Sequence, residues 1–440
     1  MRRIKKAQIT ALFCTAFCAT AYGGTFKDIQ QYCLDRGNRG MGIHWLEQCI
    51  QTVFSDDPFY LAVTTVAPGA GTAAFGPGFE FIPRVRHYEF LLTGLAAVST
   101  DGSTTGMAQL TLALPSRGLA STDKRYDPDT QPVDLRASLT LRARRINARE
   151  QDFYGLGPNT SLNRWASYGL QLTELYAGFS DPLNSWSSAG FDFSFLTPRV
   201  TSSINGRAPA MQTMYDDQTA PGLTARDDFA RYEPYAILRI PPRRSLFMRL
   251  RVGGSIYQDL GDPRYSFRRI SAASRTTIPL WVGSRNTPSH RPGIANALCP
   301  SLRSATRCSL GTVIVTGSAM ASYAEAGHQA PFYFDQTLGG ADIDGNDTLR
   351  GFREYRFRGP NSVLFQAEYQ HPIWGPVGLV SFYDAGKVAL EPSGLSLSGM
   401  RHDIGLGLYL HAGNRELVRF YFGFGSGEGT RMAPKFPVGY

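Results

Sequence analysis

Residues 133–144, "VDLRASLTLRAR", alternate apolar and polar side chains along their whole length. Successive side chains of a β-strand point to opposite faces, so a period of two predicts a strand with one apolar and one polar side. The apolar face carries leucine and alanine, and the polar face carries arginine, aspartate, serine and threonine. The apolar face comprises Leu135, Ala137, Leu139, Leu141 and Ala143, and the arginines of the polar face are Arg136, Arg142 and Arg144.

The same alternation returns in residues 246–256, 403–410 and 418–424, "LFMRLRVGGSI", "DIGLGLYL" and "VRFYFGF". A soluble β-sandwich with one solvated face is the alternative explanation. The repeats approach the roughly 9–11 residues that a tilted membrane strand needs, and charged side chains are tolerated on the wet inner face of a barrel. The pattern therefore favours an all-β fold, a transmembrane antiparallel β-barrel. Its predicted lumen-facing arginines are Arg136, Arg142, Arg249 and Arg251.

The length of the chain is consistent with a large barrel. At about 24 residues for a strand and its connection, residues 58–440 accommodate sixteen strands, and an even count is expected. No later window holds the roughly 18 consecutive apolar residues of a membrane helix. A closed barrel is the other structure that pairs every backbone polar group within a bilayer. The long polar stretches 201–228 and 283–308 are predicted surface loops.

The N-terminus has the features of an export signal. A basic start precedes the apolar run "ITALFCTAFCATA" and an A-x-A site, Ala19-Thr20-Ala21, so residues 1–21 are predicted to be a cleaved signal peptide. Acylation of Cys18 is the alternative, although the bulky Phe17 precedes it. Residues 22–57 carry apolar residues at helical spacing and predict a short helical prefix or plug before the barrel.

Four cysteines remain after the predicted signal, in two local pairs. An exported protein favours disulfides, although the connectivity is left open by the sequence. A zinc site is the alternative, and neither pair has the C-x-x-C spacing that such sites use. The disulfide candidates are Cys33, Cys49, Cys299 and Cys308.

Few other motifs suggest chemistry. Residues 339–351, "GGADIDGNDTLRG", are rich in oxygen donors, but they lack the glycine and glutamate positions of an EF-hand calcium loop. Their composition predicts a turn instead. No complete nucleophile elbow, phosphate loop or histidine metal motif is present. The net charge of +9 includes four basic residues of the predicted signal, so nucleic-acid binding does not follow from it. We predict a protein that is not an enzyme and uses no cofactor or metal.

The stretch 347–359, "DTLRGFREYRFRG", holds four arginines between two predicted strands. The strands that follow it, in residues 362–373 and 380–388, each place one carboxylate on the predicted inner face, namely Glu368 and Asp384. Arginine binds a carboxylate through two parallel hydrogen bonds, and a charge in a partly dehydrated lumen needs a partner. Arg350 is therefore predicted to pair with these acids, and the alternative is three unrelated solvated charges.

This order of motifs resembles the BamA/TamA superfamily of outer-membrane barrels, the bacterial surface antigen family. That family carries an arginine-glycine-aromatic tip in a surface loop that folds back into a sixteen-stranded barrel, and an F-x-D-x-G motif two strands later. The resemblance covers about residues 335–440. It implies that the loop tip docks against the wall, with Glu368 as a second acidic contact. The implied residues are Arg350, Gly351 and Phe352 in the loop and Glu368, Phe382, Asp384 and Gly386 on the wall.

The resemblance also implies a bacterial outer-membrane location, contact with outer-membrane lipid, and insertion or translocation of polypeptide clients. Family members usually carry polypeptide-transport-associated (POTRA) domains before the barrel, whereas about 36 residues fill that place here. Pro434 and Pro437 lie in the expected last strand, beside the family's lateral gate, and proline is tolerated on strand edges. The rival prediction is a passive channel, in which the lumen-facing arginines favour anions.

Overall fold

The computed structural model describes residues 59–436, except for 68–71, 83, 86–87, 115–135, 185, 204–207, 241–245, 284–306, 375–376 and 413–414. The signal peptide and helical prefix predicted for residues 1–57 lie outside these ranges, as do Cys33, Cys49 and Cys299. Cys308 lies on a strand whose backbone pairs with that of Val282, so the predicted disulfides stay predictions.

Antiparallel strands make up most of the described chain. The strands are β1 (Phe59–Thr65), β2 (Ala73–Phe81), β3 (Arg84–Val85), β4 (Tyr88–Ser99), β5 (Thr104–Ala113), β6 (Ser138–Phe153), β7 (Ala166–Pro182), β8 (Ser187–Ser202), β9 (Phe229–Ile240), β10 (Phe247–Asp259), β11 (Phe267–Gly283), β12 (Arg307–Tyr323), β13 (Gln336–Leu338), β14 (Phe357–Gly359), β15 (Asn361–Trp374), β16 (Val377–Ala389), β17 (Arg401–Ala412), β18 (Arg415–Gly425) and β19 (Gly429–Lys435). Single turns of 3-10 helix span Leu162–Arg164, Met211–Thr213, Pro263–Tyr265, Phe332–Phe334 and Pro392–Gly394.

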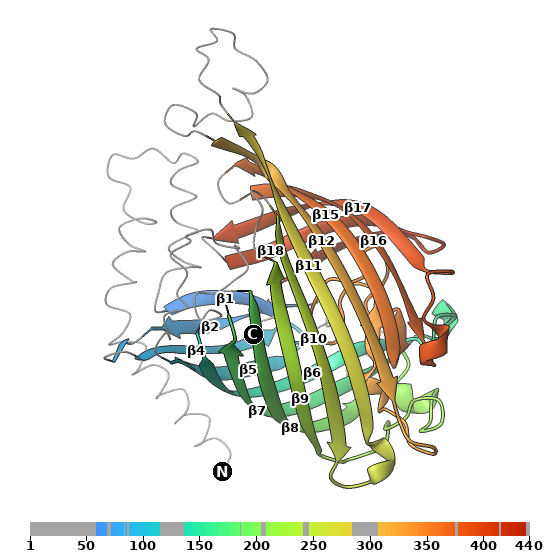
Figure 1. Cartoon of the computed structure of the whole chain (residues 1–440). Helices are drawn as coiled ribbons and strands as arrows, with labels where there is room; N and C mark the ends of the chain where they lie inside the picture. Colours follow the sequence, from blue (N-terminus) through green and yellow to red (C-terminus); the bar gives the residue numbers. More distant parts are fainter. Residues whose placement is uncertain are drawn as a thin grey trace, which may run out of the picture.

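Sixteen of these strands form one meander in which each strand is antiparallel to the next. The pairing runs β1–β2–β4, then in order from β4 to β12, then β12–β15, and in order from β15 to β19. The sheet curves round on itself, and β1 lies beside β18, so the two ends of the meander approach each other (Figure 1). The prediction of an antiparallel barrel of sixteen strands is confirmed.

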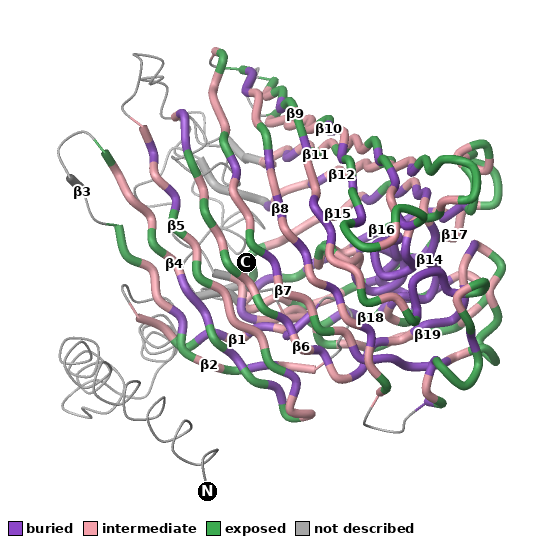
Figure 2. The backbone as a smooth tube through the Cα atoms, turned by 90° about the horizontal axis from the view of Figure 1, so that it is seen from below, coloured by how far each residue is buried: buried purple, intermediate pink, exposed green. Residues whose placement is uncertain are grey.

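The strands alternate between an exposed apolar face and a buried or half-buried polar face (Figure 2). On β6, Leu139 and Leu141 are exposed, while Arg142 points to the other side and meets Glu174 of β7. On β18, Phe420 and Phe422 are likewise exposed. An outer face of leucine and phenylalanine around a polar interior is the arrangement of a barrel in lipid. No helix in the described ranges is long and apolar enough to span a membrane.

One end of the lumen is filled by an apolar core. Inward-facing aromatic residues of the wall pack there against residues of the connections β6–β7, β8–β9 and β12–β15. The predicted surface loop 201–228 differs from expectation, because Met211, Ala220 and Leu223 are buried in this core. Burial of these apolar side chains stabilises the inward path of the segment. The polar composition of residues 201–228 did not predict this burial. Other members of the core include Phe153, Tyr168, Phe229, Tyr257, Phe332, Tyr333 and Phe334.

Candidate functional site

The connection between β12 and β15 folds into the barrel. Its strands β13 and β14 form a short antiparallel hairpin of fully buried residues, which lies against β15 and β16. The backbone turns sharply at Gly339 and Gly340, whose φ angles of 113° and 66° favour glycine. We call residues 336–359 the inner loop. Its position inside the lumen brings its arginines within reach of the wall.

Arg350 of the inner loop lies against two carboxylates of the wall. Its Nε donates to Oδ2 of Asp384 at 2.8 Å and its Nη2 donates to Oδ1 at 2.7 Å, a bidentate pair. Its backbone N–H donates to the same carboxylate at 3.2 Å, and Nη1 donates to Glu368. Arg350 is 3% exposed and Asp384 is 0% exposed. Charge-assisted bidentate bonds in a dry environment fix the orientation of the loop as well as its position.

Neighbouring side chains support this pair. The Arg350 guanidinium lies 3.9 Å from the centre of the Phe382 ring, a cation–π contact. The amide of Gln366 donates to Asp384 at 3.1 Å, and the amide of Gln370 donates to Glu368 at 2.6 Å. The alternation of β15 and β16 points these residues inward, as the sequence predicted. The structure thus brings together Arg350, Glu368, Phe382 and Asp384.

At Gly351 the backbone of the inner loop lies close to the wall. A Cβ at this position would lie 2.7 Å from Cβ of Asp403 and 2.9 Å from the backbone nitrogen of Gly425. Phe352, next in the chain, is buried and packs edge-on against Phe357 at 5.4 Å between ring centres. Glycine is required at position 351 for close approach.

Gly386 of β16 lies against the hairpin base. A Cβ there would meet Cδ1 of Leu338 at 3.0 Å and Cδ1 of Leu364 at 3.1 Å. The predicted site residues of loop and wall therefore lie in one continuous contact.

The inner loop also contacts the last strand, β19. Lys435 forms an ion pair with Asp347, whose carboxylate accepts a hydrogen bond from Tyr421 at 2.8 Å. Arg431 pairs with Glu354 at 2.7 Å. Burial raises the pKa of the Asp347 carboxyl, but Lys435 and the nearby arginines outweigh this effect, so its pKa lies well below its usual range. These contacts join the end of the meander to the inner loop.

Two arginines that the sequence left unassigned are buried structural contacts. Arg358, 1% exposed, donates to the backbone oxygen of Phe332 at 2.9 Å and to the hydroxyl of Tyr168 at 3.1 Å. Arg356 donates to Glu428 at 2.6 Å and to the side chain and backbone of Thr160 at 2.7 Å. The bonds to Tyr168, Thr160 and Glu428 join the inner loop to segments far away in the sequence. Strand alternation carries no signal for contacts of this kind.

The predicted lumen-facing arginines lie on the inner face of the wall. Arg142 and Arg251 have carboxylate partners: Arg142 meets Glu174 at 3.3 Å, and Arg251 meets Glu233 at 2.7 Å. Arg136, near the start of β6, pairs with Glu89 at 3.0 Å. Arg249 shares the inner face of β10 with Arg251 by alternation.

The acidic turn at the tip of the inner loop is closed by its own hydrogen bonds. Oδ1 of Asp342 accepts from the backbone nitrogens of Asp344 at 2.9 Å and Asn346 at 2.8 Å. Such bonds are typical of an Asx turn, the structure the sequence predicted for this stretch. Within the described ranges, no group of three or more histidine, cysteine, aspartate or glutamate residues has a metal-binding arrangement.

Comparisons with known proteins give structural neighbours alone. No family model and no curated protein matches the chain. It is similar to the structure of BamA from Haemophilus ducreyi lacking POTRA domains 1–3, with 12% identity, 86% of this chain and 69% of that one covered, and a TM-score of 0.48. CdiB from Escherichia coli gives 12% identity, 93% and 72% coverage and a TM-score of 0.48.

CdiB from Acinetobacter baumannii gives 10% identity, covers 83% of this chain and has a TM-score of 0.46. The chain spans 56% of the length of that protein. We draw no functional conclusion from likenesses at these identities and TM-scores.

Proposed function

We propose that this protein is an outer-membrane barrel of the BamA/TamA superfamily that inserts or translocates polypeptide at the bacterial outer membrane. One observation carries the proposal: Arg350, in a loop folded into the lumen, holds a bidentate pair with Asp384 on the wall. The residues of this contact are those of the superfamily motif that the sequence resembles. In this proposal the docked inner loop holds the barrel in one conformation.

The interior of the barrel supports this function over a passive porin. The inner loop occupies the lumen, and an aromatic core that includes Phe332 and Phe334 fills one end of it. No cofactor or catalytic group is part of the proposal, and its partners are lipid and unfolded or exported polypeptide.

Planar-bilayer recording of the purified barrel tests the proposal. We expect small or erratic conductance from the native protein. The Asp384→Ala variant should conduct more, because it releases the inner loop, and Arg249→Ala, a change on the wall away from the loop contact, should behave like the native protein. A steady, anion-selective conductance in the native protein would favour the porin.

Comparative envelope proteomics after deletion of the gene provides the second test. The proposed function predicts that particular outer-membrane or surface proteins are lost, while general porins are retained. An unchanged envelope, together with steady native conductance, would overturn the proposal.

A further inference from the structure

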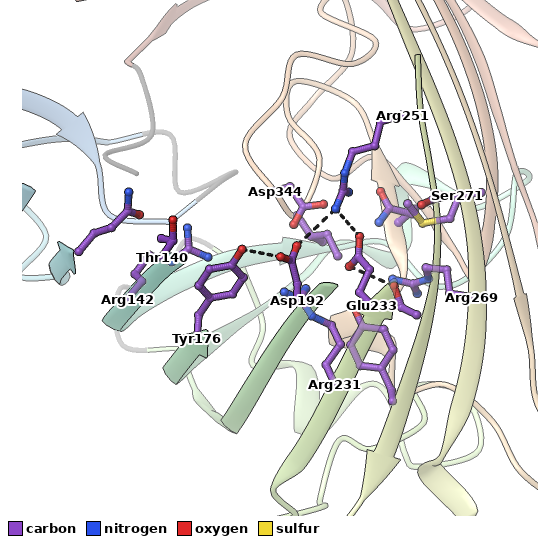
Figure 3. A pocket seen from close by; sticks show the side chains of 16 residues that line it. Thr140, Arg142, Tyr176, Asp192, Arg231, Glu233, Arg251, Arg269, Ser271 and Asp344 are labelled. Atoms are coloured by element: carbon purple, nitrogen blue, oxygen red, sulfur yellow. Dashed lines mark hydrogen bonds and ion pairs between the residues drawn. The ribbon is translucent and has the colours of Figure 1, made fainter. Parts of the chain in front are cut away.

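A cavity of about 360 Å³ lies inside the barrel, between the wall strands β5 to β12 and the tip of the inner loop (Figure 3). This volume falls in the range of small-molecule sites, roughly 300–1,000 Å³. Arginine, tyrosine and carboxylate side chains line it, so it is a polar compartment. The residues that matter to the argument are Arg142, Arg231, Arg251, Asp192, Glu233 and Asp344.

The carboxylates of the wall are already engaged. Asp192 accepts a hydrogen bond from the Tyr176 hydroxyl at 2.7 Å, and Glu233 accepts one from the Ser255 hydroxyl at 3.1 Å. Arg251 lies between them, at 3.4 Å from Asp192 and 2.7 Å from Glu233, as Figure 3 shows. These two contacts fix the position of the Arg251 guanidinium between the carboxylates.

The adjoining part of the wall has more basic than acidic groups. Glu174, which is buried, is the shared partner of Arg142 at 3.3 Å, Arg144 at 3.1 Å and Arg231 at 3.8 Å. Arg231 also donates to the Ser194 hydroxyl at 3.0 Å, whereas the buried Nε atoms of Arg142 and Arg231 meet no acceptor among the described residues. One carboxylate cannot neutralise three guanidinium groups, and buried donors without acceptors are costly. The wall therefore retains hydrogen-bonding capacity for a further anionic group.

The inner loop contributes a carboxylate to the same cavity. Asp344, on the tip turn, lines it and is exposed, and no ion pair joins it to the wall arginines in the described part of the chain. A carboxylate tethered beside basic groups repels a second anion and competes for the same donors. The loop tip is thus placed to weaken the binding of an anion at this site.

We propose that this cavity is a binding site for a compact oxyanion, a carboxylate or a phosphate. Arg142 and Arg231 donate to the ligand, Arg251 contributes positive charge, and Asp344 of the inner loop opposes binding. The inference stands apart from the proposed function, since a barrel of either functional class can hold the site.

Calorimetric titration of the detergent-purified full barrel tests the site, with ionic strength held constant by sodium chloride. The probes are inorganic phosphate and an acetylated, amidated diglutamate peptide, which offer the same chemistry as a free ion and as part of a polypeptide. Saturable binding of either probe supports the proposal. The probe that binds more tightly shows whether the natural ligand is a free ion or an anionic group of a polypeptide. Absence of saturable binding by both probes overturns it.

Substitutions assign the site. Arg231→Gln removes a donor and should weaken binding about tenfold, the effect of losing one hydrogen bond to a charged group. Arg249→Gln removes a positive charge from the inner face of β10 outside the cavity lining, and it should weaken binding less than Arg231→Gln does, because Arg249 donates no hydrogen bond to the ligand in this proposal. Equal affinities in the two variants contradict the assignment.

The Asp344→Asn variant tests the site without changing a buried residue. It removes the opposing charge from an exposed turn and should strengthen binding several-fold. If Arg231→Gln fails to fold, Asp344→Asn still tests the proposed anion site. An unchanged or weaker affinity in Asp344→Asn overturns the proposal.

Discussion

Two charged clusters lie in one lumen and differ in the sign of their excess. Around Arg350, the carboxylates of Asp384 and Glu368 converge on one guanidinium and hold it from two sides. Around Glu174, three guanidinium groups converge on one carboxylate. In the first cluster the arginine's geometry is fully specified, which suits a contact that must hold a loop in one place. In the second cluster, arginine N–H groups remain that the proposed anion can use.

Removal of Asp384 is the severest test of this contrast. Asp384→Ala leaves the buried Arg350 guanidinium without its bidentate partner, and breaking a buried pair in this way costs about 3–5 kcal/mol. We expect loss of heat-resistant mobility on cold gels and a lower unfolding temperature. Asp344→Ala, which removes an exposed acid from the same loop, should change stability by less than about 0.5 kcal/mol. Equal effects of the two substitutions would mean that the Arg350–Asp384 pair stabilises the protein no more than an exposed acid does.

A double-mutant cycle measures the coupling within the pair. Arg350→Ala and Asp384→Ala should together cost less than the sum of their separate effects, with a coupling of up to about 3 kcal/mol, as contacting residues show. Thermal or denaturant unfolding of the four proteins provides the values. Strict additivity would indicate that the two side chains contribute independently.

Gly351→Ala tests the close approach of the loop tip to the wall. The new methyl group would lie 2.7 Å from Cβ of Asp403, and such overpacking costs about 1–3 kcal/mol. Limited proteolysis should cut the inner loop faster in this variant. Gly254→Ala on β10 is the matched control, because no heavy atom beyond its chain neighbours lies within 4 Å of the added Cβ. Comparable cleavage rates in the two variants would contradict close packing at residue 351.

Acid should loosen the inner loop. Because the pKa of Asp347 is lowered on folding, its contribution to stability is full above the unfolded pKa of about 3.9 and is lost as the pH falls below it. Loss of this contribution should therefore raise the protease susceptibility of the loop below about pH 4. Lys435→Met removes the principal charge that lowers this pKa, so the loop should be cleaved faster already at neutral pH and the rise in acid should be smaller. An identical acid profile in both proteins would exclude this pair as the cause.

Removing the ion pair between β19 and the inner loop should have the smallest effect. Arg431→Gln loses its ion pair with Glu354 and its hydrogen bond to the backbone oxygen of Phe352. Ion pairs that keep contact with solvent are worth about 0.2–1 kcal/mol, and the remaining amide can still donate one hydrogen bond. A small decrease in unfolding temperature that diminishes at high salt is expected. A loss as large as that of Asp384→Ala would show that the last strand, and not Asp384, holds the loop.

The wall was predictable from the sequence and much of the interior was not. Alternation assigned Leu139 and Leu141 outward and Arg142 inward, because a strand in this setting has one apolar face. The contact of Arg350 with Asp384 was anticipated from motif order together with the inward faces of β15 and β16. Strand alternation alone does not pair residues so far apart.

The contacts that were missed are those between distant segments. Arg358 meets Tyr168 across 190 residues, and nothing local to either residue signals the other. The burial of Met211 in the aromatic core was missed for the same reason, since it depends on Phe332 and Tyr333 arriving from another connection. Sequence periodicity reports which face a residue occupies, and partners across the lumen depend on the closed shape of the barrel.

The bond between Arg356 and Thr160 joins residues 196 positions apart. Its loop-closure entropy is offset only when strands from both halves of the chain are already in place, which makes such contacts late events in folding. The inner loop therefore cannot reach its final position while the barrel is half built. We therefore expect docking of the inner loop to be one of the last steps of folding.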